Sequence, residues 1–124
     1  MIGLYVNNRS AEHFADKIAQ GLKAIETRTK RSVQNFLTSG IVKGDRFAIV
    51  ADGRIVCYAV FGGLKPYENE KDFNADYRRH LVGKGSKYGY DPKRSKIGIL
   101  LSDVAIEKNE IKVNRTHGYT WTVC

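Results

Sequence analysis

Three charged residues, Lys23, Glu26 and Arg28, stand close together in the sequence and are the best candidates for chemistry in this chain. Side chains of an extended segment alternate between two faces, so Glu26 and Arg28 should point in the same direction. Lys23 joins them if the chain turns at Ala24. A carboxylate between two cations should stay ionised and can hold both side chains in place.

This group of charges can do chemistry in two ways. Arg28 offers a planar fork of N–H donors that suits a phosphate or the edge of a base. Lys23 can act as a base or a nucleophile if partial desolvation lowers its pKa. On the residues alone, a surface salt-bridge cluster of little energetic value explains the same three residues equally well.

A second group of candidates lies between residues 78 and 96, where cations far outnumber acids. The cations are Arg78, Arg79, Lys84, Lys87, Lys93, Arg94 and Lys96, and the single acid is Asp91. Basic side chains can neutralise phosphates while Tyr88 and Tyr90 stack on unpaired bases. This combination favours single-stranded or looped RNA over a duplex. A solvated loop whose tyrosines pack back on the protein is the equally weighted alternative.

A third, smaller group is the polar run Thr29, Lys30, Arg31 and Ser32, directly after the first group. It can extend a phosphate-binding surface, or it can be an ordinary polar turn.

Composition narrows the class of protein. The chain has 124 residues, a length that indicates one domain over residues 1–124. Its net charge of +8 favours a polyanionic partner such as nucleic acid, and a solvated basic surface is the plain alternative. Apolar residues make up 42%, which argues against disorder.

No apolar run approaches the roughly 20 residues that span a bilayer. Cys57 and Cys124 have no partners at metal-ligand spacing, so we expect a reduced, cytoplasmic protein with no metal and no cofactor. The oligomeric state stays open.

Hydrophobic patterning predicts the strands that must position these residues. The expected strands are residues 2–6, 25–29, 45–51, 54–61, 97–101 and 119–123, with weaker ones at 104–106 and 111–113. The pair Asp52-Gly53 predicts a tight hairpin, because a type I′ turn needs positive φ at both central positions.

The predicted helices are fewer. Ser10 should cap a helix whose apolar stripe runs to Leu22 and which Gly21 ends. Residues 33–37 have the spacing of a single helical turn, and residues 68–82 form a second main helix that Gly83 ends. Two main helices and about six short strands in this order indicate a small α+β fold with a curled or barrel-like sheet.

The segment Gly21-Leu22-Lys23-Ala24-Ile25-Glu26-Thr27-Arg28 is similar to the Gly-x-Lys-x-x-Glu-x-Arg pattern of the ASCH family. Downstream, Lys43-Gly44-Asp45-Arg46-Phe47-Ala48-Ile49 is similar to that family's Gly-Asp-Arg and strand. The chain therefore resembles ASCH proteins, which are part of the PUA-like group of small β-barrels. The resemblance implies a cleft between the first helix and the sheet, lined by Lys23, Glu26 and Arg28.

Family members are thought to bind RNA or modified nucleosides, so the resemblance implies an RNA- or nucleotide-binding domain. The residues expected to contact nucleic acid are Lys23, Arg28, Lys30, Arg31, Arg79, Lys84, Lys87, Tyr88, Tyr90, Lys93 and Arg94.

An enzyme on the same cleft is the alternative. One branch of the family hydrolyses acetylated cytidine with a Lys, a Thr and a Glu, and other members have been linked to RNA cleavage. Lys23 matches that Lys, but the Thr falls at Glu26, and the Glu would come from near Glu68 or Glu70. An amidohydrolase or ribonuclease would use Lys23 as base or nucleophile, with Glu26 or Glu68 moving protons. A protein-interaction domain with a basic surface is the third hypothesis.

Overall fold

The computed structural model describes residues 1–114 and 120–124, which form a six-stranded mixed sheet and four helices. The strand order is β2-β5-β4-β3-β1-β6, and every neighbouring pair is antiparallel except β1 with β3. The elements are β1 (Ile2–Tyr5), α1 (Phe14–Ala19), β2 (Ile25–Thr29), α2 (Lys30–Leu37), β3 (Arg46–Ala51), β4 (Arg54–Pro66), α3 (Glu70–Ala75), α4 (Tyr77–His80), β5 (Lys96–Ile106) and β6 (Trp121–Val123).

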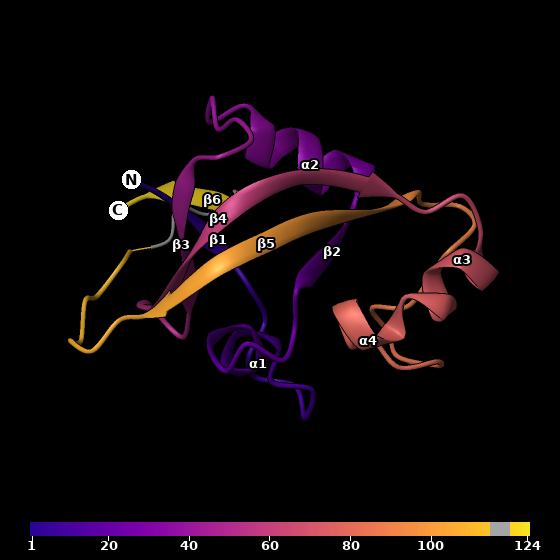
Figure 1. Cartoon of the computed structure of the whole chain (residues 1–124), viewed down its shortest axis with the longest axis horizontal. Helices are drawn as coiled ribbons and strands as arrows, with labels where there is room; N and C mark the ends of the chain where they lie inside the picture. The colour runs from indigo at the N-terminus through magenta and orange to yellow at the C-terminus, as the bar shows by residue number, and fades with distance from the viewer. Residues whose placement is uncertain (115–119) are drawn as a thin grey trace.

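The sheet curls because its two longest strands bend. Register shifts interrupt the pairing of β4 with β5, and Gly63 takes a φ of 98° at one of them. Such bulges increase local twist and curvature. Figure 1 shows β4 and β5 arching together from the hairpin to α3. The strands at the two ends, β2 and β6, are not paired with each other. The expected α+β fold with a barrel-like sheet is confirmed, with the barrel left open on one side.

The main core fills the curled sheet. Phe36 of α2 makes edge-on ring contacts with Phe47 of β3 and Phe61 of β4, at 5.4 and 5.9 Å between centroids. Phe14 and Ile18 of α1 belong to the same buried cluster. In the view of Figure 1, α2 lies above the strands and α1 below them, and both helices contribute side chains to this one core. Burial of each such side chain contributes about 1.5–3 kcal/mol, so the core holds both helices against the strands.

Several predicted elements are confirmed. Residues 25–29 form β2, and the Asp52-Gly53 turn has φ values of 53° and 74°, as a type I′ hairpin requires. The predicted strands 97–101 and 104–106 are one continuous strand, β5. Residues 111–113 contribute only an isolated bridge from Lys112 to Arg54. Tyr119, the first residue of the expected last strand, lies outside the described residues.

The predicted start of the first helix is wrong. The helix begins at Phe14 rather than after Ser10, and His13 precedes it in a left-handed conformation with φ 47°. Ser10 instead closes a turn, since its carbonyl accepts from the N–H of His13 at 3.1 Å. The Asn8 side chain accepts from Asp16 N–H at 3.2 Å, in the first turn of α1. The predicted end is right, because Gly21 follows the helix with φ 76°.

The polar run after β2 is helical. Residues 30–32 form the first turn of α2, and the Thr29 hydroxyl caps it by accepting from Ser32 N–H at 3.3 Å. Only residues 33–37 were expected to be helical. None of the described helices is both long and apolar enough to cross a bilayer.

The predicted helix over residues 68–82 is also wrong, because it is broken in two at Asp76. The Asp76 carboxylate accepts from Tyr67 at 2.6 Å, Arg79 at 2.7 Å and Lys65 at 3.0 Å. Burial alone would raise the pKa of Asp76, but these hydrogen bonds lower it well below its usual range. The second helix, α4, then ends at Leu81 with φ 59°, before Gly83. Asp76 thus joins the α3–α4 corner to β4.

We expect Asp76→Asn to lower the free energy of unfolding by about 1–3 kcal/mol at pH 7, because it removes the charge that three donors share. The folded pKa of Asp76 lies below the unfolded value of about 3.9, so this stabilisation is complete above that value. It is lost as the pH falls through the folded pKa. Urea unfolding at pH 7 and pH 3 should show a smaller difference between the two proteins at pH 3.

Asp72→Asn is the matched control, because Asp72 is an exposed carboxylate on α3. Its effect should be small at both pH values. An Asp76→Asn penalty that does not change with pH would contradict the assignment to the ionised carboxylate.

Candidate functional site

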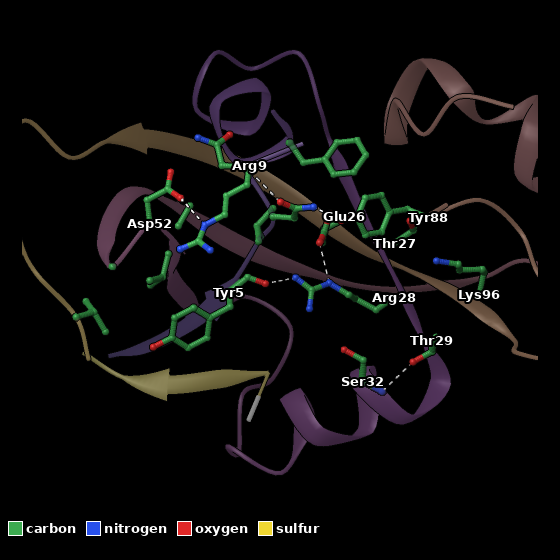
Figure 2. Close-up of a pocket in the computed structure, with 18 of the residues that line it drawn as sticks. Tyr5, Arg9, Glu26, Thr27, Arg28, Thr29, Ser32, Asp52, Tyr88 and Lys96 are labelled. Atoms are coloured by element: carbon green, nitrogen blue, oxygen red, sulfur yellow. Dashed lines mark hydrogen bonds and ion pairs between the residues drawn. The ribbon is translucent and has the colours of Figure 1, made fainter. Parts of the chain in front are cut away.

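A cleft of about 740 Å³ opens at the side of the sheet that is not closed. Its walls are the end of β1 with the turn that follows, strand β2, the start of α2 and the β3–β4 hairpin, with Tyr88 and Lys96 on a further side. Figure 2 shows Arg28 near the middle of this cleft, between Tyr5 and Glu26. The cleft therefore lies between the edge strand β2 and the end of β1.

Glu26 and Arg28 lie on the same side of β2, as the alternation predicted. The Arg28 Nε donates to Glu26 Oε2 at 2.7 Å, and Arg28 Nη2 donates to the carbonyl oxygen of Tyr5. Glu26 is 5% exposed, and the Arg28 side chain is 17% exposed. The guanidinium is thus fixed at two nitrogens and links β2 to β1 across the open side of the sheet.

Lys23 lies beneath the cleft rather than on its wall. Its residue is 1% exposed, and its amine donates to the carbonyl oxygen of His80 and stands 3.6 Å from Glu26 Oε1. The amine also sits 4.4 Å from the ring centroid of Phe14. Burial lowers the pKa of Lys23, and the neighbouring carboxylate of Glu26 opposes that shift. Lys23 therefore pairs with Glu26 without itself lining the cleft.

His80 holds the segment to which Lys23 is attached. Its Nδ1 accepts from Val82 N–H at 2.9 Å, so the neutral ring carries its proton on Nε2, which donates to the Phe73 carbonyl at 2.6 Å. The ring stacks on Phe73 with centroids 4.2 Å apart, and burial lowers its pKa. A neutral, fully satisfied histidine thus fixes the end of α4 over Lys23.

Residues 83–95, which lie between α4 and β5, are called the basic loop, and its two tyrosines have different positions. Tyr88 lines the cleft, accepts a hydrogen bond from Asn7 Nδ2, and meets Phe14 edge-on at 5.6 Å. Tyr90 is turned away: its ring lies 6.1 Å from Phe73, and its hydroxyl donates to the carbonyl of Glu68 at 3.2 Å. The structure therefore brings Tyr88, and not Tyr90, to the cleft.

Most of the cations predicted to contact nucleic acid are exposed and do not line the cleft. Arg79 is paired with Asp76. Lys30 N–H donates to the carbonyl of Ser95 at 3.1 Å, which joins the start of α2 to the end of the basic loop. The exposed cations are Lys30, Arg31, Lys84, Lys87, Lys93 and Arg94. Lys96, in contrast, lines the cleft and is buried, and burial lowers its pKa.

The turn after β1 was missed as part of the site. Asn7, Asn8 and Arg9 all line the cleft, and Arg9 Nε lies 3.6 Å from Asp52 Oδ1 of the hairpin at its rim. The only signal in the sequence was a polar run directly after a strand, which also describes any surface turn. Among the described residues, no three His, Cys, Asp or Glu side chains gather where they could hold a metal ion.

Comparison with known proteins identifies the fold. No protein-family model and no curated protein matches the sequence. Among solved structures, the ASCH protein of Zymomonas mobilis superposes with a TM-score of 0.72 at 14% identity, over 98% of this chain and 85% of that one. A serine-to-alanine variant of the same protein gives 0.68 at 15% identity over 98% and 85%, and a tyrosine-to-phenylalanine variant gives 0.70 at 14% over 98% and 87%. The structural neighbours of this chain are ASCH proteins, and its fold is the PUA-like fold of those structures.

Proposed function

We propose that the chain binds single-stranded or looped RNA, or a nucleotide, in the cleft over Arg28. The observation that carries this proposal is the guanidinium itself. Glu26 and the Tyr5 carbonyl fix two of its nitrogens while the side chain still reaches the cleft. A donor fork held rigid in this way loses little entropy when it binds a phosphate or a base edge.

The size and lining of the cleft support a nucleotide as ligand. Its volume of about 740 Å³ falls in the range of about 300–1,000 Å³ typical of small-molecule sites. Tyr88 supplies an aromatic wall for a base, and the side chains of Asn8 and Arg9 supply polar groups at the other side. Unpaired bases are recognised by such a combination of stacking and edge contacts.

The charge around the cleft supports RNA as the source of that nucleotide. The net charge is +8. The exposed cations Lys30 and Arg31 stand between the cleft residues Thr29 and Ser32, and Lys87 precedes Tyr88. These cations suit the phosphates on either side of the bound residue. The ASCH fold agrees with this assignment, because the resemblance implies RNA or modified nucleosides as ligands.

We expect Arg28→Lys to weaken binding of a single-stranded RNA about tenfold, because the charge remains but the two-point fork is lost. Arg31→Lys is the matched control, since Arg31 is exposed on α2 and a point charge should serve there equally well. Fluorescence anisotropy at fixed salt measures both affinities. Equal affinities of Arg28→Lys and wild type, with both proteins folded, would argue against the cleft as the binding site.

The exposed cations of the basic loop should contribute through phosphate contacts alone. For a single strand, each lost contact reduces the slope of log affinity against log salt by about 0.7. We therefore expect the double variants Lys84→Met/Lys87→Met and Lys93→Met/Arg94→Met to have shallower salt slopes with little change in sequence preference. Anisotropy titrations across a salt series test this. A slope equal to that of wild type in both double variants would remove the loop from the binding surface.

One observation favours the amidohydrolase or ribonuclease alternative. Burial lowers the pKa of Lys23, and a carboxylate oxygen of Glu26 lies 3.6 Å from its amine. A base or nucleophile must reach its substrate, however, and this amine is directed to Glu26 and the His80 carbonyl below the cleft. We expect no acetate release from acetylcytidine and no RNA cleavage. Turnover that Lys23→Met abolishes without loss of ligand binding would establish the enzyme instead.

A further inference from the structure

Lys96 is a largely buried residue, 8% exposed, whose side chain lines the cleft. Within the part of the chain that the structure describes, its amine makes no hydrogen bond and no ion pair. Figure 2 shows the amine end of Lys96 directed from β5 into the cleft, toward Tyr88. Buried charges are normally paired, so this exception needs an explanation.

The charges around Lys96 make its position more costly. Arg28 and Lys96 both line the cleft, and Lys23 lies beneath it. Glu26 attracts all three cations, but its two carboxylate oxygens face Lys23 and Arg28 rather than Lys96. Attraction to Glu26 raises the pKa of Lys96, but burial and the repulsion of Arg28 lower it. Among the described residues, the cleft is lined by three cations, Arg9, Arg28 and Lys96, but by only two carboxylates, Glu26 and Asp52.

The hydroxyl groups of Thr29 and Ser32, at the start of α2, can each donate a hydrogen bond near Lys96. Thr29 Oγ1 already accepts from Ser32 N–H, and Ser32 Oγ lies 3.3 Å from Thr120 Oγ1. In the pairing of β2 with β5, Thr29 is the register partner of Lys96, and Thr29 is also the residue that caps the eight-residue helix α2. Thr29 and Ser32 both line the cleft. The first turn of α2 contains no acidic residue. A helix N-terminus carries partial positive charge and favours an anion, and here Lys30 and Arg31 occupy the positions where acids are usual.

We propose that Lys96, Thr29 and Ser32 form a phosphate subsite at the α2 end of the cleft, and that it takes the phosphate of a nucleotide or of an RNA residue. The nucleotide part of this statement rests on the proposed function. The rest of the cleft, toward Tyr5 and Arg9, then receives the nucleoside. A bound phosphate supplies the missing counter-charge. It accepts a hydrogen bond from the Lys96 amine and neutralises the excess positive charge beside Arg28.

The test compares Lys96→Met, which keeps the length of the side chain and removes its charge, with Lys71→Met. Lys71 is exposed on α3, and no residue of α3 lines the cleft, so this variant has the same change in net charge. The probes are inorganic phosphate, each common nucleoside with its 5′-monophosphate, and a single-stranded RNA. Calorimetry and NMR of the lysine side-chain signals report binding.

Wild type and Lys71→Met should bind a monophosphate at least about tenfold more tightly than its nucleoside, and Lys96→Met should lose most of that difference. Lys96→Arg, which keeps the charge, should retain it. Without ligand, Lys96→Met should melt at the same temperature as wild type or higher, because an unpaired buried charge is removed. Melting well below wild type would overturn the proposal and make Lys96 a structural residue.

The outcomes separate this inference from the proposed function. If wild type binds RNA and Lys96→Met binds RNA and monophosphates equally well, the phosphate subsite is wrong and the RNA-binding function stands. If RNA does not bind but inorganic phosphate or a monophosphate shifts the Lys96 signals, and Lys96→Met does not bind it, the subsite stands as a small-anion site. If no phosphate probe binds wild type, the subsite is overturned.

Discussion

The carboxylate of Glu26 is the contact on which the arrangement of this molecule depends. One of its oxygens faces Lys23, whose amine also holds the end of α4 through the His80 carbonyl, and the other accepts from Arg28, whose far nitrogen reaches Tyr5 of β1. Strand β2 is thereby connected on one side to a helix and on the other to the strand across the open side of the sheet. A single buried anion between two cations does this without a further strand to close the barrel. Removing one member of such a group leaves an uncompensated buried charge, which typically costs about 3–5 kcal/mol.

The same group has a second consequence, because it leaves the cleft positively charged. The carboxylate of Glu26 is paired with Lys23 and Arg28, and within residues 1–114 and 120–124 the largely buried Lys96 makes no hydrogen bond or ion pair through its amine. Within the protein alone this arrangement lowers stability, since burial disfavours the charged amine. In the proposed phosphate subsite, an anionic ligand would offset this cost by pairing with the Lys96 amine. Stability given up at a binding site in this way is common in proteins whose function requires it.

Much of the local structure follows from the sequence because it depends on near neighbours. Asp52-Gly53 makes its hairpin wherever it stands between two strands, and the alternation of β2 places Glu26 beside Arg28. The boundaries that were mispredicted depend on distant partners. Asp76 interrupts a helix that periodicity predicted to be continuous, because its carboxylate binds Lys65, near the end of β4, and Tyr67, which follows that strand. Ser10 is a residue type that often caps a helix, but α1 begins only at Phe14. The side chain of Asn8, in the preceding turn, accepts from Asp16 N–H in the first turn of the helix.

The sequence by itself determined the α+β fold class, the hairpin, the shared face of Glu26 and Arg28, and the excess of positive charge, because each follows from spacing or composition. Only the tertiary structure decided which cations reach the cleft. Lys23 and Lys96 have the same side chain, yet Lys23 is covered by Phe14 and the end of α4, while Lys96 opens toward Tyr88 and the start of α2. That difference arises where segments far apart in the chain pack together, and the desolvation of a charge depends on that packing rather than on its neighbours in sequence.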